Sequence, residues 1–436
     1  MKKISPLVVL GLILALLLAA CEGLPFEIPW LGEATPTPTL ALDDTLETPT
    51  AEPSPTVEPT PEDVTSLTVW VPPDMDPALE TDASRLFLAQ LDMFSEIHNG
   101  LEINVRVKAP SGTGGLLDSL TATSAAAPDA LPDVVALSRG DLETAALKGL
   151  IFAMDGLTQI PDDDDWFNFT REMALLQGST FGLPFASDAL TLVYRPAITP
   201  EFPASWSDLL QGETPLAFPS ESDQALFPLA LYLAAGGAIQ DNQRRPILEV
   251  EPLTEVFRLI QDGVSSGTLV NDLTQYQTTG QAWAAFRDGQ ADLVVTWVSD
   301  YLSEGPADAA LAPLLPVSDS AVSLGTGMCW AVAAPEAYRH PMAVSLAEFL
   351  VQPAFLSDWS LAAGVLPARP SALEAWPDTS MVAKLSQIAL MTQLVPSNDL
   401  ITSLGPVIRE GTRQVLQEMV DPAQAAQVAV ESLEEQ

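Results

Sequence analysis

The chain has 436 residues, of which 58 are acidic and 18 basic, so its formal net charge at pH 7 is −40. Binding to phosphate groups needs clustered Lys and Arg side chains, so this charge argues against nucleic acid and against a basic patch for anionic lipid. Hydrophobic residues make up 47% of the chain, which is enough to bury a core. With two His and two Cys, we expect no cofactor, no metal site and no disulfide framework.

The first residues have the pattern of an export signal. Lys2 and Lys3 precede an almost purely apolar run over residues 7–18, which is too short for a transmembrane helix. The run ends on Leu18-Ala19-Ala20-Cys21, which resembles the lipobox of bacterial lipoproteins. That resemblance implies a signal peptide over residues 1–20, and a diacylated Cys21 that anchors the chain at the outer face of the cell membrane. The alternative is a plain secretory signal with an incidental Cys.

A tether follows the predicted anchor. Residues 33–64 are rich in Thr, Pro, Glu and Asp. Such a segment cannot bury enough apolar area to fold, and its prolines favour extended conformations. We therefore expect residues 21–64 to be a lipidated Cys with a disordered tether, and residues 65–436 to be the folded body.

The folded body alternates strand and helix patterns, in chain order. The strand patterns are Leu67–Val71, Leu101–Val107, Val134–Leu137, Ala189–Tyr194 and Leu293–Trp297. The helix patterns are Arg85–His98, Asp141–Leu147, a short helix capped by Ser205, Ala225–Ala235, Thr254–Gln261, Ala282–Arg287, Met342–Leu350, Ser380–Leu394, Ile401–Met419 and Pro422–Leu433. This alternation predicts an α/β fold built from βαβ units with a mostly parallel sheet.

Short motifs occur in a fixed order along residues 66–436. They are Pro132-Asp133-Val134-Val135, Gly149-Leu150-Ile151, Gly182-Leu183-Pro184, Pro203–Leu209, Ala285–Ala291, Ala347–Leu350 and Gly364–Arg369. Behind a lipobox and a tether, this order resembles the extracellular solute-binding proteins of family 1, the maltose-binding-like receptors of bacterial ABC importers. Phe181, Arg195 and Ser207-Asp208 depart from the family's usual residues and leave the ligand's identity open.

The resemblance implies a periplasmic-binding-protein-like fold of two α/β lobes, with a cleft between them. Lobe 1 would comprise about residues 65–187 and 318–364, and lobe 2 about 188–317 and 365–436. The chain would cross between the lobes near residues 185–190, 313–320 and 363–369. The ligand would lie in the cleft at the carboxyl ends of strands.

Nine residues are candidate ligand contacts by their place in this scheme: Asp74, Ser138, Arg139, Gln224, Phe227, Trp297, Ser299, Asp300 and Arg409. We favour Trp297 as a platform for a sugar, because aromatic planes pack against the C–H faces of sugars. The competing interpretations are a core role for Trp297, solvated surface charges for Asp74, Arg139 and Arg409, and a turn residue for Asp300.

Other conspicuous residues receive structural interpretations. Trp70 and Trp206 are assigned to the core, and Trp330 to the core or the cleft. Cys329 lies in an apolar run, which predicts a buried side chain and not a nucleophile. The acidic run Asp162–Asp165 lacks the spacing and the Gly of a calcium loop and predicts a solvated turn.

The main functional hypothesis is a lipid-anchored receptor that passes a sugar or oligosaccharide to the permease subunits of an ABC importer. We expect a monomer that is not an enzyme and that closes its lobes over the ligand. One alternative is an exported glycan-active enzyme, because the 58 acidic residues leave room for a carboxylate pair. Another is a two-lobed receptor used for sensing.

Overall fold

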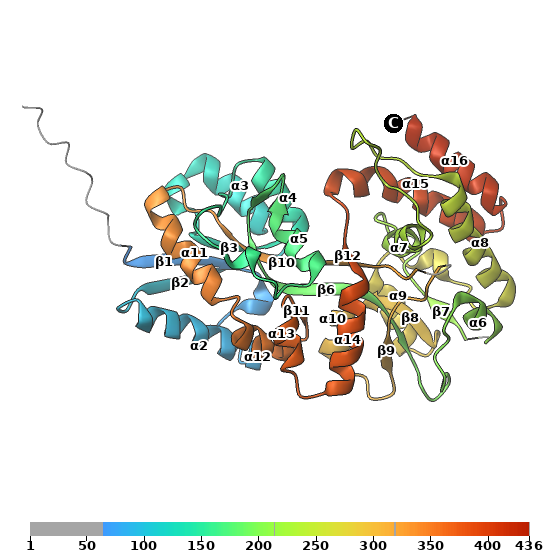
Figure 1. Cartoon of the computed structure of the whole chain (residues 1–436), viewed down its shortest axis with the longest axis horizontal. Helices are drawn as coiled ribbons and strands as arrows, with labels where there is room; N and C mark the ends of the chain where they lie inside the picture. Colours follow the sequence, from blue (N-terminus) through green and yellow to red (C-terminus); the bar gives the residue numbers. More distant parts are fainter. Residues whose placement is uncertain (1–63, 213, 318–319, 436) are drawn as a thin grey trace, which may run out of the picture. The chain divides into compact units, whose positions relative to one another are not determined.

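The structure, a computed structural model, describes residues 64–212, 214–317 and 320–435 (Figure 1). Cys21, the signal segment and almost all of the predicted tether lie outside the described residues. Within the described part, no helix is both long enough and apolar enough to cross a membrane.

The described residues are organised around one large mixed sheet with the strand order β2-β1-β3-β10-β6-β8-β7. The bounds of these strands are β1 (Ser66–Val71), β2 (Glu102–Val107), β3 (Val134–Ser138), β6 (Leu183–Tyr194), β7 (Leu216–Ala217), β8 (Leu293–Trp297) and β10 (Ser323–Val332). Three short strands join its centre: β9 (Ala310–Ala312) and β11 (Leu366–Pro367) on β6, and β12 (Thr392–Leu394) on β10. A separate hairpin pairs β4 (Leu175–Leu176) with β5 (Ser179–Thr180).

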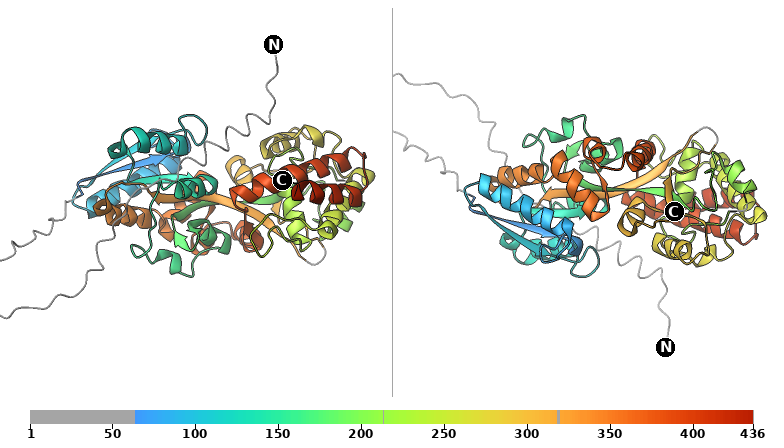
Figure 2. Two further views of the ribbon diagram at one scale, coloured as in Figure 1. Left: turned by 90° about the horizontal axis from the view of Figure 1, so that it is seen from above. Right: turned by 90° about the horizontal axis from the view of Figure 1, so that it is seen from below.

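The helices gather in two groups around the two ends of this sheet (Figures 1 and 2). The group around β1–β3 contains α2 (Asp82–Ile97), α3 (Leu116–Ala126), α4 (Arg139–Leu147), α11 (His340–Phe349) and α12 (Pro353–Ala363). The group around β7 and β8 contains α6 (Trp206–Gln211), α7 (Leu226–Ala234), α8 (Val250–Ser266), α9 (Thr279–Arg287), α15 (Asn398–Leu416) and α16 (Pro422–Glu434). Between them lie α5 (Asn168–Ala174), α10 (Val298–Glu304), α13 (Pro370–Glu374) and α14 (Thr379–Met391).

The prediction of a mostly parallel sheet is wrong at the sheet's centre. β1 pairs in parallel with β2 and β3, as βαβ units require. However, β6 and β10 run antiparallel to each other. In addition, β6 runs antiparallel to β8, and β10 runs antiparallel to β3. The βαβ rule governs strands joined by a crossover helix within one lobe. β6 and β10 instead run from one lobe into the other, so the rule does not fix their direction.

The long strand β6 shows how the lobes are joined. Its first residues, Leu183–Ala189, pair with β10, and its last, Leu190–Tyr194, pair with β8. The apolar alternation predicted only Ala189–Tyr194 as a strand. One continuous backbone ladder therefore connects the sheet of lobe 1 to the sheet of lobe 2.

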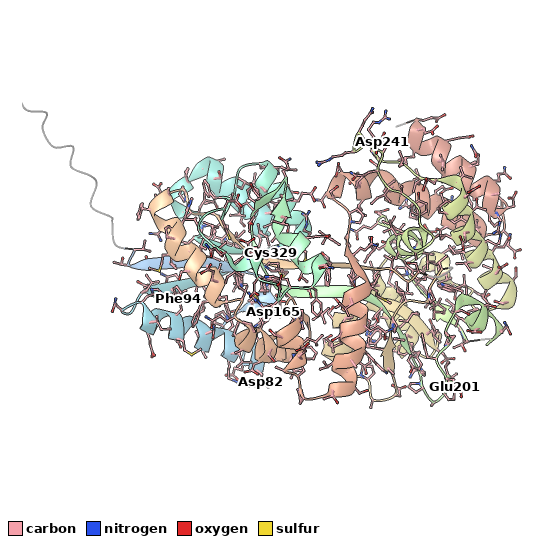
Figure 3. The ribbon with its side chains drawn as sticks, viewed as in Figure 1. Asp82, Phe94, Asp165, Glu201, Asp241 and Cys329 are labelled. Carbon is pink, nitrogen blue, oxygen red and sulfur yellow. The ribbon has the colours of Figure 1, made fainter. Side chains whose placement is uncertain are left out.

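Aromatic side chains form part of the core around β1, β3 and the first half of β6. Trp330 is 1% exposed and stacks against Phe185 at 4.5 Å and Phe87 at 6.1 Å between ring centroids. Trp330 therefore belongs to the core, and Trp70 is buried as predicted. Cys329, labelled in Figure 3, is fully buried, which confirms its predicted core role. Burial raises the pKa of its thiol to about 12.

The acidic run Asp162–Asp165 is more than the solvated turn that we predicted. The Arg369 guanidinium is almost fully buried and lies 3.1 Å from Asp163 and 3.4 Å from Asp165. It also stacks over the Trp166 ring at 4.1 Å. Because Arg369 lies two residues after the end of β11, these contacts fix that segment to the loop before α5. The hydrogen bond from Arg369 lowers the pKa of Asp163.

Candidate functional site

A cavity of about 430 Å³ lies where β6 and β10 pass between the two helix groups. Its wall comes from the 3-10 turn after β1, the end of β3, the middle of β6 and β10, the first turn of α10, and α12. The lining residues are Asp74, Met75, Thr81, Ala83, Ser138, Phe185, Ala186, Ser187, Asp188, Ser299, Thr326, Gly327, Met328, Trp359, Ala362, Ala363 and Val365. The cavity thus combines an apolar wall with hydroxyl groups and two carboxylates.

Asp188 of β6 is the polar centre of this wall. One carboxylate oxygen accepts hydrogen bonds from the backbone N–H groups of Ala189, at 2.9 Å, and Ser299, at 3.1 Å. The other accepts the Ser299 hydroxyl at 2.5 Å. Burial raises the pKa of Asp188 to about 7, against the lowering effect of these hydrogen bonds. The contact joins the strand β6 to the beginning of α10, in the same wall as Asp74 and Ser138.

Three of the predicted contacts lie on this cavity: Asp74, Ser138 and Ser299. Asp74 is exposed in the turn after β1, and Ser138 ends β3. The Ser138 hydroxyl also accepts the Asp141 N–H at 3.2 Å and so caps α4. Three segments far apart in the sequence therefore place polar groups around one cavity, as the strand-end rule leads us to expect.

Three further candidates lie around a smaller cavity of about 170 Å³ in lobe 2, which is lined by Gln224, Phe227 and Trp297 among others. Trp297 is half-buried at the end of β8. Phe227 is 3% exposed and packs against Phe218, with ring centroids 4.9 Å apart. Asp300 is engaged within its own turn, where it hydrogen-bonds the Thr296 hydroxyl and accepts the Trp297 N–H at 3.3 Å.

The two predicted cationic donors each hold an acidic partner. Arg139 lies 3.2 Å from Glu143, and both side chains are 11% exposed. Arg139 borders a different cavity, of about 840 Å³, between α4 and the beginning of α15. Arg409 pairs with Asp223. Whether either contacts a ligand stays a prediction.

Asp188 was missed by the sequence reasoning, although a signal was present. An acidic residue within the otherwise apolar strand Leu183–Tyr194 is costly unless it has a role at a site or a partner. Trp359 and Thr326 carried no such signal, because neither the helix nor the strand that holds them was predicted. Among the described residues, no group of three His, Cys, Asp or Glu side chains is placed to hold a metal ion.

Comparison with known proteins agrees with this architecture. The family model described as bacterial extracellular solute-binding protein matches residues 89–388. No curated protein matches the chain.

Solved structures match over most of their length. The GacH receptor of Streptomyces glaucescens GLA.O, solved unliganded and with acarbose, is 18% identical with a TM-score of 0.63, covering 85% of this chain and 97% of that one. A cyclo/maltodextrin-binding protein complexed with maltotetraose is 18% identical with a TM-score of 0.70, covering 86% and 97%. The sugar-binding protein MalE of Xanthomonas citri is 16% identical with a TM-score of 0.70, covering 85% and 97%.

These matches confirm the predicted two-lobed, periplasmic-binding-protein-like α/β fold. The family model covers well over half of the chain. The chain therefore belongs to the family of bacterial extracellular solute-binding proteins.

Proposed function

We propose that the protein is a lipid-anchored receptor that binds a sugar or oligosaccharide and delivers it to the permease subunits of an ABC importer. The observation that carries this proposal is the 430 Å³ cavity, which is lined by the turn after β1, the end of β3 and α12, together with the first turn of α10, the helix that follows β8. The fold is shared with proteins whose structures contain acarbose and maltotetraose, and hydroxyl and carboxylate groups are suitable partners for sugar hydroxyls.

Closure of the lobes is the mechanism that this placement supports. A ligand that contacts the turn after β1 on one side and the first turn of α10 on the other interacts with both lobes at once. It therefore binds the closed arrangement more tightly than the open one, and shifts the equilibrium toward it by that difference in affinity.

The lobe boundaries and hinge crossings are part of the same proposal. The predicted crossings near residues 185–190 and 363–369 coincide with the middle of β6 and with β11, which pair with each other at Ser187 and Leu366. The crossing near 313–320 falls between β9 and β10. Chain segments that lie side by side in a sheet are suited to act together as a hinge.

The test is a thermal-shift screen of the Cys21→Ser form with maltose, maltotetraose, acarbose and D-tagatose, the last of which is bound in a related structure from Thermotoga lettingae. A true ligand at a hundredfold excess over Kd stabilises the folded state by about 2.7 kcal/mol. Stabilisation by at least one of these sugars supports the proposal. No stabilisation by any of them, or turnover of a glycan substrate, contradicts it.

Substitution of two tryptophans distinguishes a loss of ligand affinity from a loss of folding stability in the same experiment. Trp297 lines the 170 Å³ cavity and not the 430 Å³ one, so Trp297→Ala tests whether the ligand extends from the larger cavity onto this half-buried ring. For a ligand that does, we expect a loss of affinity of about 2 kcal/mol or more. For Trp206→Ala, which removes a ring that is 6% exposed, we expect a loss of stability of about 3–5 kcal/mol and little change in affinity. If Trp297→Ala lowers the melting temperature without changing Kd, the ring is a core residue.

A further inference from the structure

The 430 Å³ cavity has an unbalanced charge. Two of its lining residues, Asp74 and Asp188, are acidic, and none of its lining residues is Lys, Arg or His. Within the described part of the chain, neither carboxylate forms an ion pair with a cation. The Arg139 guanidinium, which follows Ser138 in the chain, is held by Glu143 and borders a different cavity.

Asp188 is the more costly of these two charges. Its three hydrogen bonds come from neutral donors, two backbone N–H groups and the Ser299 hydroxyl. The neighbouring carboxylate of Asp300 repels its negative charge and so raises its pKa further. A half-buried carboxylate such as Asp188, without a cationic partner, is destabilised relative to its protonated form. A positive charge in the cavity would supply that partner.

We propose that this cavity selects a solute that carries a protonated amine, such as an aminosugar, over the matched neutral solute, and excludes the matched anionic one. This inference rests on the proposed function, in which the cavity is the ligand site. The ammonium group would lie beside Asp188, with Asp74 adding to the negative potential from the opposite lobe. The charge of −40 on the whole chain attracts cations and repels anions at longer range.

The rest of the wall suits the carbon skeleton of such a solute. Phe185, Met328 and Trp359 offer apolar surface, and Thr326 and Ser138 offer hydroxyl groups. An amine on a hydroxylated ring would contact the carboxylates, the hydroxyl groups and the apolar surface of the cavity. A simple inorganic cation would leave the apolar wall unoccupied.

The experiment compares D-glucosamine, D-glucose and D-glucuronate by calorimetric titration of the Cys21→Ser chain at one ionic strength. The three probes share a ring and differ in charge. We expect glucosamine to bind at least about tenfold more tightly than glucose, and glucuronate to show no binding. Glucose binding as tightly as glucosamine, or any binding of glucuronate, overturns the proposal. So does the binding of neither glucosamine nor the non-sugar amine spermidine.

Variants test whether the two carboxylates are responsible. Asp188→Asn and Asp74→Asn should each reduce the preference for glucosamine over glucose by about fivefold or more. Asp92→Asn is the matched control, because it removes the same charge from an exposed position on α2 outside the cavity, and it should leave the preference unchanged. Asp74 is exposed, so its variant keeps the test valid even if Asp188→Asn unfolds the chain. An unchanged preference in Asp74→Asn, and in Asp188→Asn where it folds, contradicts the assignment.

The outcomes also separate this inference from the proposed function. If neutral sugars bind and the amine gives no advantage, the sugar receptor stands and the charge selection fails. If spermidine binds and none of the sugars does, the charge selection stands and the carbohydrate assignment fails.

Discussion

At the scale of single residues, the raised pKa of Asp188 predicts how the stability of the fold depends on pH, and this prediction can be tested without a ligand. Its pKa is about 7 in the folded chain, against an ordinary value of 3.8. Between about pH 4 and pH 7 the folded state therefore binds more protons than the unfolded state does. The contribution of this group to stability is full below about pH 4, falls as the pH rises toward 7, and is constant above that.

The measurement is the free energy of unfolding by urea between pH 5 and pH 8. We expect Asp188→Asn to gain stability relative to the unsubstituted chain as the pH rises from 5 to 7, because the variant cannot ionise. Asp92→Asn should follow the unsubstituted chain over the same range. Parallel pH profiles for the unsubstituted chain and Asp188→Asn would show that this carboxylate has an ordinary pKa.

Several residue assignments could be made from sequence because burial follows local pattern. Trp70 and Cys329 lie in apolar runs of the sequence and are buried in the structure. Trp206, assigned to the core because it belongs to a structural motif, is buried as well. Side-chain pairing was beyond such reasoning. Arg139 was predicted as a ligand donor, and only the fold shows that Glu143, one turn later on α4, holds it. Strand β10 places Thr326 on the cavity wall, and that strand was not among the predicted ones.

At the scale of elements, the glycines of β10 explain why this strand was hard to predict. A side chain at Gly327 would place its Cβ 2.2 Å from the Ala186 carbonyl oxygen of β6. A side chain at Gly325 would place its Cβ 2.4 Å from the Thr392 side chain of β12. These close approaches require glycine, yet glycine in a sequence pattern indicates a turn. Gly327 and Gly325 thus allow β10 to pack closely against β6 and β12, and the same glycines made β10 difficult to predict as a strand.

The clamp around Arg369 yields an element-scale prediction. Arg369 is 3% exposed and ties the segment after β11 to Asp163 and Asp165. For Arg369→Gln we expect a loss of about 2 kcal/mol in the free energy of unfolding, because the contact of the buried guanidinium with the Trp166 ring is lost and the partly buried Asp165 is left without a cation. Arg287→Gln is the control, since the pair of Arg287 with Glu304 is far more exposed and should be worth less than about 1 kcal/mol. Equal losses from the two variants would show that burial of Arg369 adds nothing.

At the scale of the whole molecule, charge and anchoring have to be considered together. A chain with a net charge of −40 is repelled by an anionic membrane surface. Stable attachment would therefore depend on acyl chains, each of which contributes about 0.8 kcal/mol per buried CH₂ group. Two such chains on Cys21 are enough for firm attachment, whereas a single chain gives only marginal binding.

The last prediction tests that dependence in cells. Cys21→Ser should release the protein from carbonate-washed membranes into the soluble fraction, because no helix among the described residues is long and apolar enough to cross the membrane. The released protein should keep the melting temperature of the anchored form, since residues 61–436 form a compact unit without the N-terminal segment. Cys329→Ser is the matched control: it removes the other thiol, which is fully buried, and should leave the protein on the membrane. A Cys21→Ser protein that stays as firmly bound as the unsubstituted chain would show that attachment does not run through this cysteine.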